Sequence, residues 1–347
     1  MGGRVCPPMM QPGGVGPGRE EVGTSVPPMS SNGSSIYHQG WFLDAATDGR
    51  WGEARVIEGG NVVGRLPYAL ETCAGFSVSR MPSLIRTLGP EIPALTGKSA
   101  TILRRRLAIT HALIDQLPGV ADFYQVFDPR VTDAVAFMQR GFGVSLGYSF
   151  WIERGQTEAQ LLDAMTAEPR RHLRKAAGQF SIVPLHDISE FCRFYDANLG
   201  GDNNNFHGSE RMRRLLAAVT DHKTGMLLGA RTAQGALVAT IGILWDDVAV
   251  RNYVGSRQAG VSNASILLLW EAMRIACEKG LAFDFDGATS PGMFEYLWSL
   301  GGTLVMRLRV RRSTLAFRAA RACAGIVGKK HYFDGMARST TRRRNAQ

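Results

Sequence analysis

Two acidic side chains at the end of an apolar run are the first candidates for chemistry in this sequence. Asp284 and Asp286 alternate with Phe283 and Phe285, which is the pattern of a strand with one apolar face. Gly287 follows, so Asp286 is expected at the edge of a sheet, where ligands bind in α/β folds. A carboxylate there can orient an amine or accept a proton from it, and Asp284 is the alternative on the same face. The competing interpretation of Asp286 is a helix cap or turn carboxylate.

A glycine-containing turn, Arg257-Gln-Ala-Gly260-Val-Ser-Asn263, is the second candidate. It joins a predicted strand to a predicted helix, whose first N–H groups and dipole attract phosphate. Gly260 permits close approach of a ligand to the backbone, and Ser262 or Asn263 can cap the helix. We therefore predict a phosphate or pantetheine-diphosphate cradle formed by Arg257, Gly260, Ser262 and Asn263. An ordinary capped loop is the alternative.

Tyr253 lies on the strand before this turn and is a candidate donor of a proton to a departing thiolate. Acyl transfer to an amine needs a neutral amine, N–H groups that stabilise an oxyanion, and close positioning of the two reactants. The other role open to Tyr253 is that of a buried strand tyrosine with one hydrogen bond.

An acceptor groove is predicted from aromatic and polar residues elsewhere in the chain. His38 and Trp41 are candidates for one wall, although Trp41 also fits a core position. Residues 196–207 are polar and rich in glycine, which indicates a loop that closes over an acceptor or a plain solvated loop. Tyr195, just before this segment, and Asn198, within it, are further candidates for acceptor binding.

A basic helix follows residue 169. Arg170 and Arg174, with Arg171 and Lys175 on the adjoining face, have the spacing of helical neighbours. They could hold the phosphates of a nucleotide-linked or lipid-linked acceptor, and a solvated basic face is the alternative. Upstream, Thr157 is predicted to cap a first connector helix, and Pro169 to stand at the first position of the second.

The elements that must position these residues occur in the same order twice. The second half predicts strands at 225–231, 236–245, 248–255, 281–286 and 303–311, with helices at 263–279 and 291–299. The first half predicts strands at 53–58, 62–69, 122–127 and 144–152, with helices at 103–117 and 130–140. We interpret this as a duplicated α/β lobe with an offset of roughly 160 residues; chance similarity is the alternative.

Length and composition favour a two-lobed globular protein. The 347 residues, with 45% hydrophobic and 20% charged side chains, suffice for two ordinary domains. We predict a flexible leader at 1–35, a first lobe at 36–153, a helical connector at 154–180, a second lobe with the donor site at 181–312, and a basic tail at 313–347. The Gly-, Pro- and Ser-rich leader lacks the apolar core of a signal peptide, and no apolar run is long enough to span a membrane.

Five scattered cysteines indicate neither a disulfide framework nor a zinc site, and fit buried thiols in a reducing cytoplasm. The net charge of +10 comes from the tail, because residues 307–347 carry twelve Lys and Arg against the single acid Asp334. Three roles are open to this tail and its predicted helix at 315–327: packing on the first lobe, lying on an anionic membrane, or touching RNA.

The element order, with the R-x-x-G-x turn at Arg257, resembles the GNAT acyltransferase fold. The duplication resembles, more specifically, the FemAB-like superfamily of peptidoglycan-bridge aminoacyltransferases and the related acyl-CoA-dependent enzymes of cell-envelope polysaccharides. The likeness runs from residue 36 to residue 312. It is carried by Ile36-Tyr-His-Gln-Gly-Trp41, Val63-Gly-Arg-Leu-Pro-Tyr68, Arg170-Arg-His-Leu-Arg-Lys175-Ala, Phe191-Cys-Arg-Phe-Tyr195, Phe285-Asp286-Gly287 and Tyr296-Leu-Trp-Ser-Leu-Gly-Gly302.

The resemblance implies an α/β fold of tandem GNAT-like lobes with mixed central sheets flanked by helices. It implies an N-acyltransferase that takes an acyl group from acyl-CoA, such as acetyl-CoA, as cosubstrate, with no permanently bound cofactor or metal. The acceptor would be a small or lipid-linked amine of an envelope saccharide or peptidoglycan precursor, in the cytoplasm or at the inner face of the membrane.

The sequence departs from the family at two positions. Leu297 stands where a lysine is common, and Ser262 stands where Gly or Ala is usual. A coiled-coil arm, found in some members that use tRNA, is missing, which favours acyl-CoA. The alternatives are an aminoacyl-tRNA-dependent transferase and a non-catalytic RNA- or membrane-binding protein with the same fold.

Overall fold

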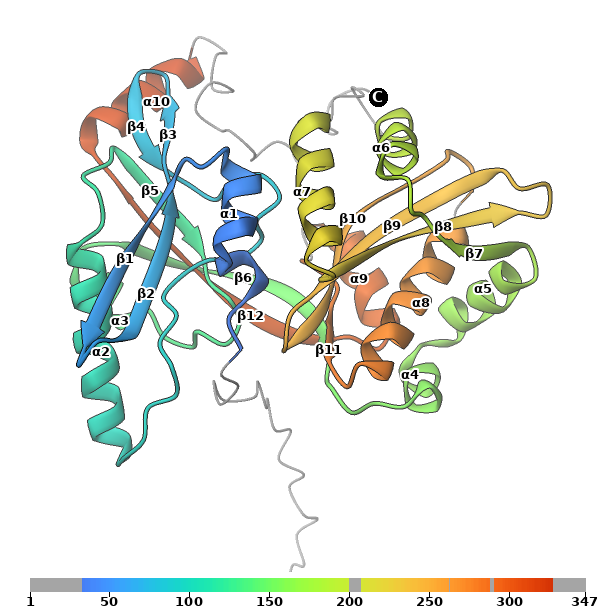
Figure 1. Ribbon diagram of the computed structural model, residues 1–347, viewed down its shortest axis with the longest axis horizontal. Helices are drawn as coiled ribbons and strands as arrows, with labels where there is room; N and C mark the ends of the chain where they lie inside the picture. Colours follow the sequence, from blue (N-terminus) through green and yellow to red (C-terminus); the bar gives the residue numbers. More distant parts are fainter. Residues whose placement is uncertain (1–32, 200–206, 262, 288–289, 327–347) are drawn as a thin grey trace, which may run out of the picture.

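A computed structural model describes residues 33–199, 207–261, 263–287 and 290–326 (Figure 1). Its centre is a mixed sheet of ten strands in the order β3-β4-β5-β12-β6-β11-β10-β9-β8-β7, and β1 and β2 form a separate hairpin. The strands are β1 (Trp51–Glu58), β2 (Asn61–Ala69), β3 (Glu71–Cys73), β4 (Phe76–Ser79), β5 (Asp122–Val126), β6 (Gly143–Ile152), β7 (Phe180–Pro184), β8 (Gly225–Thr232), β9 (Leu237–Trp245), β10 (Ala249–Arg257), β11 (Ala282–Asp284) and β12 (Thr303–Ser313).

Each half of the chain gives its last strand to the other half. β12, from the second half, pairs with β5, while β6, from the first half, pairs with β11. Phe123 pairs with Arg312, and Phe283 pairs with Ile152, so Phe123 and Phe283, like Ile152 and Arg312, are 160 residues apart. β6 and β12 lie antiparallel at the centre. The two lobes thus share one sheet and repeat the same register, whereas the sequence suggested a sheet for each lobe.

Helices cover the sheet in separate groups. The helices are α1 (Gly40–Thr47), after the short 3-10 turn η1 (Ile36–His38), α2 (Ser99–Asp115), α3 (Val135–Gln139), α4 (Glu158–Ala164), α5 (Ala167–Ala177), α6 (Ile188–Ala197), α7 (Ser209–Asp221), α8 (Asn263–Glu278), α9 (Pro291–Ser299) and α10 (Leu315–Ile326). Side chains of α4, α5, α8 and α9 form one core with the second-half strands. Side chains of η1, α1, α6 and α7 form another core, and Figure 1 shows α7 between α1 and those strands.

The strands and helices predicted for the second half are all present, and their ends differ from the predicted ones by at most two residues, because their apolar periodicity is strong. The helix predicted at 130–140 is wrong in its first turn, since α3 begins only at Val135 and Arg130 is held by Asp128 and by the carbonyl of Gly33. α5 begins at Ala167, so Pro169 is its third residue rather than its first. The sequence analysis missed the short strands β3, β4 and β7 and the helices α1, α6 and α7.

Both ends of the described chain are anchored to the first half. Ser35, which composition placed in the leader, is buried, and Ser34 donates a hydrogen bond to Glu91. At the other end, α10 packs through the buried Phe317 against Val78. The tail helix therefore packs on the first half, which is one of the three roles considered for it. In the described part of the chain, no helix combines the length and the apolarity needed to cross a bilayer.

Candidate functional site

The central sheet opens between β10 and β11. These parallel strands pair over only three positions, from Ala249 to Arg251 on β10. Beyond this point one side-chain contact, from Asn252 Nδ2 to the carbonyl of Phe285 at 3.3 Å, links the two segments. Among the described residues, β10 continues to Arg257 beside β9 alone, with a bulge at Tyr253. Because β10 keeps no partner on one side, its N–H groups there are available to a ligand.

The predicted donor turn lies at the far end of β10. Gly260 has a φ of 82°, a left-handed conformation that glycine adopts at no steric cost, and α8 begins at Asn263. Arg257 is the last residue of β10, so Arg257, Gly260 and Asn263 follow one another from the strand through the turn to the first residue of the helix. Ser262 lies outside the described residues. Backbone N–H groups and the helix dipole at this position favour an anion.

α9 lies near this turn. Burial raises the pKa of Tyr296 to about 12, while the nearby Arg257 guanidinium acts in the opposite direction. Leu297, which stands where the resembling family often has lysine, is buried in the core between α8 and α9. A lysine would have to bury its ammonium there, so packing explains this departure from the family pattern.

The two candidate carboxylates lie on the sheet face opposite α8. Phe283 and Phe285 point into the α8 core, so the alternating Asp284 and Asp286 point to the other face. Asp284 is 1% exposed, accepts a hydrogen bond from Ser149 Oγ at 2.7 Å, and pairs with Arg307. It is therefore a buried member of an ion cluster.

Asp286 is held between two guanidinium groups. Its carboxylate lies 2.7 Å from Arg86 Nε and 3.2 Å from Arg307 Nη1. Its φ of 62° is unusual for a residue with a side chain, as is the φ of 70° at Leu84. Such strained positions cluster at functional sites. Because Arg86 comes from the first half of the chain, both halves contribute to the cluster around Asp286.

Tyr253 links the same two halves. Its hydroxyl is buried and donates to the carbonyl of Leu84 at 2.8 Å, while Arg86 Nη2 donates to the Tyr253 carbonyl at 2.9 Å. Burial raises the pKa of Tyr253 well above its usual value. The hydroxyl thus lies on the face away from α8 and the donor turn, with a backbone partner.

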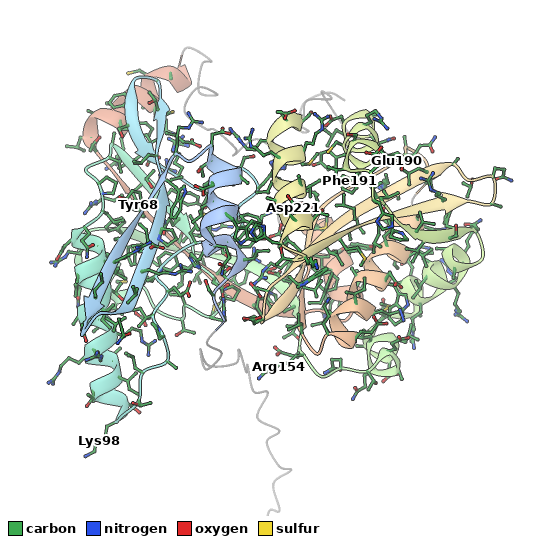
Figure 2. The ribbon with its side chains drawn as sticks, viewed as in Figure 1. Tyr68, Lys98, Arg154, Glu190, Phe191 and Asp221 are labelled. Atoms are coloured by element: carbon green, nitrogen blue, oxygen red, sulfur yellow. The ribbon has the colours of Figure 1, made fainter. Side chains whose placement is uncertain are left out.

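Two further groups in this region escaped the sequence analysis. Tyr37 has a buried hydroxyl with no hydrogen-bond partner among the described residues, and burial, with the charge of Asp286, raises its pKa. Arg251 is 2% exposed, lies over the Tyr37 ring, and pairs with Asp246 at 2.7 Å. The signal that could have revealed this buried ion pair is an arginine directly after the apolar start of a strand, next to Val250. Figure 2 shows side chains filling the space between α1 and the second-half strands.

The predicted acceptor residues do not form one wall. Tyr195 on α6 is buried and lies near enough to Arg86 for that charge to act on its pKa, which burial raises. His38 instead faces Glu91 of the first half. Trp41 stacks on His222 at 4.0 Å between ring centroids, in the contact of α1 with α7.

The remaining predicted acceptor residues lie outside this cluster. Asn198 ends α6 and donates to the carbonyl of Phe194, and residues 200–206 of the predicted closing loop are outside the described part. Arg170 and Arg174 lie on α5, with no ion-pair partner within the described ranges. In those same ranges no group of His, Cys, Asp and Glu is arranged to hold a metal ion.

Neither a family model nor a curated protein sequence matches this chain. Among solved structures, the crystal structure of FemX is similar with a TM-score of 0.57 and 11% identity, over 81% of this chain and 93% of FemX. The C-terminal domain of a putative lysylphosphatidylglycerol synthetase from Agrobacterium fabrum gives 0.49 and 12%, over 83% and 91%. L-PGS from Bacillus licheniformis gives 0.48 and 13%, over 83% and 91%. The similarity to FemX shows the FemAB-like GNAT fold that the sequence motifs predicted.

Proposed function

We propose that this protein is an N-acyltransferase that moves an acyl group from acyl-CoA to an amine. The observation that carries the proposal is the opening between β10 and β11, which leads to the turn at Gly260 and the first residue of α8, Asn263. An extended donor fits an opened sheet edge, and its diphosphate suits the helix N-terminus. The similarity to FemX supports the fold within which we place the donor.

Different groups of the site would serve the successive steps of the acyl transfer. The amine nitrogen attacks the thioester carbonyl, and N–H groups of β10 without a strand partner stabilise the resulting oxyanion. The C–S bond then breaks, the thiolate leaves and takes up a proton, and the amide remains. Asp286, fixed by Arg86 and Arg307, orients the amine, whose proton passes to water. We assign Tyr253 to holding the bulge of β10, because its hydroxyl already donates to Leu84.

For the acceptor, we propose an amine of a cell-envelope saccharide or peptidoglycan precursor. The sequence resemblance supports this class. We place the reaction in the cytoplasm or at the inner face of the membrane. A membrane contact would be made by the basic residues 327–347, which lie outside the described residues.

An aminoacyl-tRNA donor is the second candidate, and one observation favours it. Four cationic side chains of α5, at Arg170, Arg171, Arg174 and Lys175, have no carboxylate partner among the residues that the structure describes. Unpaired cations on one helix are suited to a polyanion.

Calorimetric titration of the full chain with acetyl-CoA tests the first proposal. Binding should weaken at least tenfold in Gly260→Val, because a branched side chain obstructs the backbone at the cradle. Gly235→Val is the matched control, since Gly235 has the same conformation, with a φ of 83°, in the β8–β9 turn. An absence of heat at millimolar acetyl-CoA would count against the proposal and favour a non-catalytic protein.

Salt-dependent retention of tRNA on the immobilised protein tests the second candidate. The matched comparison is a chain without residues 327–347. The deletion should stop there because Ser313 is bonded to Asp122 and α10 packs on Val78. Retention that survives the deletion but falls in the double variant Arg170→Gln, Arg174→Gln would support a tRNA donor. Loss of retention on deletion would instead assign RNA contact to the tail.

A further inference from the structure

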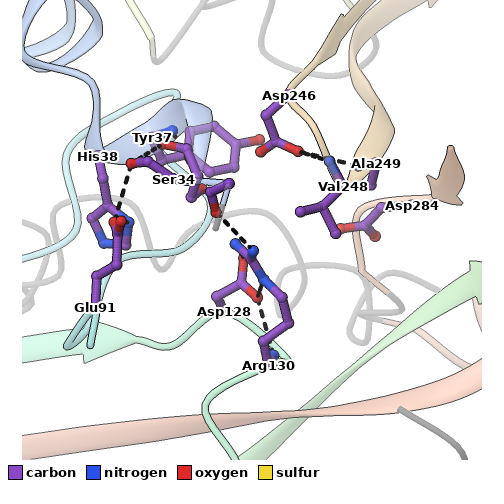
Figure 3. A network of polar contacts seen from close by, with 12 residues as sticks. Ser34, Tyr37, His38, Glu91, Asp128, Arg130, Asp246, Val248, Ala249 and Asp284 are labelled. Atoms are coloured by element: carbon purple, nitrogen blue, oxygen red, sulfur yellow. Dashed lines mark hydrogen bonds and ion pairs between the residues drawn. The ribbon is translucent and has the colours of Figure 1, made fainter. Parts of the chain in front are cut away.

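The two faces of the shared sheet differ at its centre. On one face, Asp284 lies in the region of polar contacts around Tyr37 of η1 (Figure 3). On the other face, the central strands β6 and β12 carry large apolar side chains. Met306 and Tyr148 are paired in the ladder and share this second face with Phe150, which belongs to the α8 core. The second face is thus apolar where the two halves of the chain meet.

Five apolar side chains on this second face form an exposed strip. We define the strip by Leu146, Tyr148, Phe294, Leu304 and Met306, whose exposed fractions are 49%, 42%, 41%, 41% and 59%. Phe294 of α9 joins the four strand residues, because its ring lies 4.9 Å from that of Phe150, which is paired with Leu304. On the other side of the strip, Leu308 packs against the core of the first half. The strip lies between two cores, and the described part of the chain leaves it about half exposed.

The size of the strip fits a protein–protein contact. A large apolar side chain that is fully exposed presents roughly 150–200 Å², so five that are about half exposed present roughly 400 Å². A standard interface takes about 800 Å² from each partner, and a little more than half of that area is apolar. A monomer seldom exposes a larger apolar patch than this, and such patches often mark a binding surface.

Opposite charges lie at the two ends of the strip. Arg312 is exposed on the same face at the far end of β12, with its guanidinium 4.3 Å from the centre of the Phe142 ring. Glu295 is exposed at the other end, next to Phe294 on α9. Neither charge has an ion-pair partner in the ranges that the structure describes. An anionic bilayer attracts clusters of cations, whereas one cation and one carboxylate at opposite ends suit a second copy of the same strip in the reverse direction.

We propose that two copies of this chain associate through their strips, related by a twofold axis that lies between the two sheets and crosses the strands. Such an axis reverses the strand direction, so Arg312 of each copy meets the partner's Glu295, and the symmetry forms this pair twice. Met306 is buried at the centre of the contact. Asp284 and Asp286 lie on the opposite face of the sheet, so the dimer leaves the candidate site open, and the inference does not depend on the proposed function.

Sedimentation equilibrium of the full chain tests the proposal, and the wild type should form a dimer whose fraction rises with concentration. Met306→Glu should weaken the dimer at least tenfold, because each copy then buries a carboxylate in an apolar contact. Met226→Glu is the matched control, since Met226 is a strand methionine that is 40% exposed on β8. Both variants should keep the circular dichroism of the wild type, because both side chains are exposed in the single chain. A wild type that stays monomeric, or a dimer unchanged by Met306→Glu, would overturn the proposal.

Charge reversal tests the direction in which the strips meet. Arg312→Glu and Glu295→Arg should each weaken the dimer severalfold, because each change brings like charges together, and the double variant should recover most of the wild-type affinity. A double variant that is weaker than either single variant would overturn this arrangement. Vesicles of phosphatidylglycerol and phosphatidylcholine test the other occupant: binding of a monomeric protein that is lost in Met306→Glu would overturn the proposal and assign the strip to lipid.

Discussion

At the scale of single residues, the site depends on buried charges that neutralise one another. The ion pairs form a chain of alternating charge. Asp286 pairs with both Arg86 and Arg307, and Arg307 also pairs with Asp284. A buried charge without a partner costs several kcal/mol, so the members of such a series depend on one another. A substitution at one of these residues should therefore destabilise the others, and unfolding measurements can detect the loss.

Asp286→Asn should lower the free energy of unfolding by about 3–5 kcal/mol, because it removes the carboxylate that pairs with Arg86 and one of the two that pair with Arg307, which keeps Asp284. Urea denaturation measures the loss. Asp163→Asn, an exposed position on α4, is the control and should have little effect. A variant of wild-type stability would show that the ion pairs are not needed. Full turnover in a stable variant would remove Asp286 from the mechanism.

Tyr253→Phe tests the bond between the halves. The change removes the donor to Leu84 and leaves a buried carbonyl without a partner, which should cost about 1–2 kcal/mol. The comparison is Tyr148→Phe, since Tyr148 is 42% exposed on β6. Equal unfolding midpoints for the two variants would contradict a structural role for the Tyr253 hydroxyl.

His207 should make the stability depend on pH. Burial, with the charges of Arg86 and Arg211, lowers the pKa of His207 from 6.5 to about 3. Below pH 6.5 the His207 ring is protonated in the unfolded chain but stays neutral in the folded protein. The free energy of unfolding therefore falls as the pH drops from about 6.5 to about 3. His207→Asn should flatten this slope in unfolding measurements across the window. The exposed His186→Asn should not, and parallel slopes for all three proteins would refute the assignment.

The sequence could suggest the carboxylates of this cluster but not their partners. Asp284 and Asp286 stood out because acids in an apolar strand are rare. Arg307 was counted with the basic tail, and its burial against Asp284 arises from the exchange of β12, which no local pattern shows. Arg86 lies between β4 and α2 and reaches Asp286 from the other half of the chain. Contacts of this kind depend on topology and not on spacing.

At the scale of elements, prediction succeeded where a local interaction decides the structure. Thr157 was predicted to cap a helix, and it forms a full capping box with Gln160 at the start of α4. The predicted start of α5 was wrong, because this helix begins two residues before Pro169. A proline without an N–H is tolerated throughout the first turn, so its presence does not fix the first residue. The short β3 and β4 have too few residues for a visible alternation.

Thr157→Ala should lower the free energy of unfolding by about 1 kcal/mol, because it removes the acceptor for the Gln160 N–H at the start of α4. Thermal or urea unfolding measures the change. The control is Thr101→Ala in the first turn of α2, an exposed position where the helix has no side-chain cap. An equal effect of both changes would indicate that the capping box contributes nothing particular.

At the scale of the whole molecule, the exchange of β6 and β12 makes the two lobes depend on each other. The opening that we propose for the donor is bounded by β11, and β11 has β6 of the other half as its second neighbour. β5 is likewise completed by β12. The sequence suggested a boundary between two lobes near residue 153, and this division of the chain stays a prediction. The strands on its two sides belong to one shared sheet.

This arrangement predicts how the protein behaves when it is split in the loop after β6. The fragments 1–155 and 156–347 each lose a central strand, so each should expose an unpaired strand edge, aggregate, and lack a cooperative unfolding transition. Expressed together, they should associate, because β6 and β12 can restore their antiparallel ladder from Gly143 to Trp151. Size exclusion and urea denaturation measure both properties. A cut at Gly235, in the β8–β9 hairpin, is the comparison, because it divides neighbouring strands of one half. If the 1–155 fragment alone unfolds cooperatively as a monomer, then β12 is not needed to complete its sheet, and the contacts of Arg86 with Asp286 would be those of two docked domains.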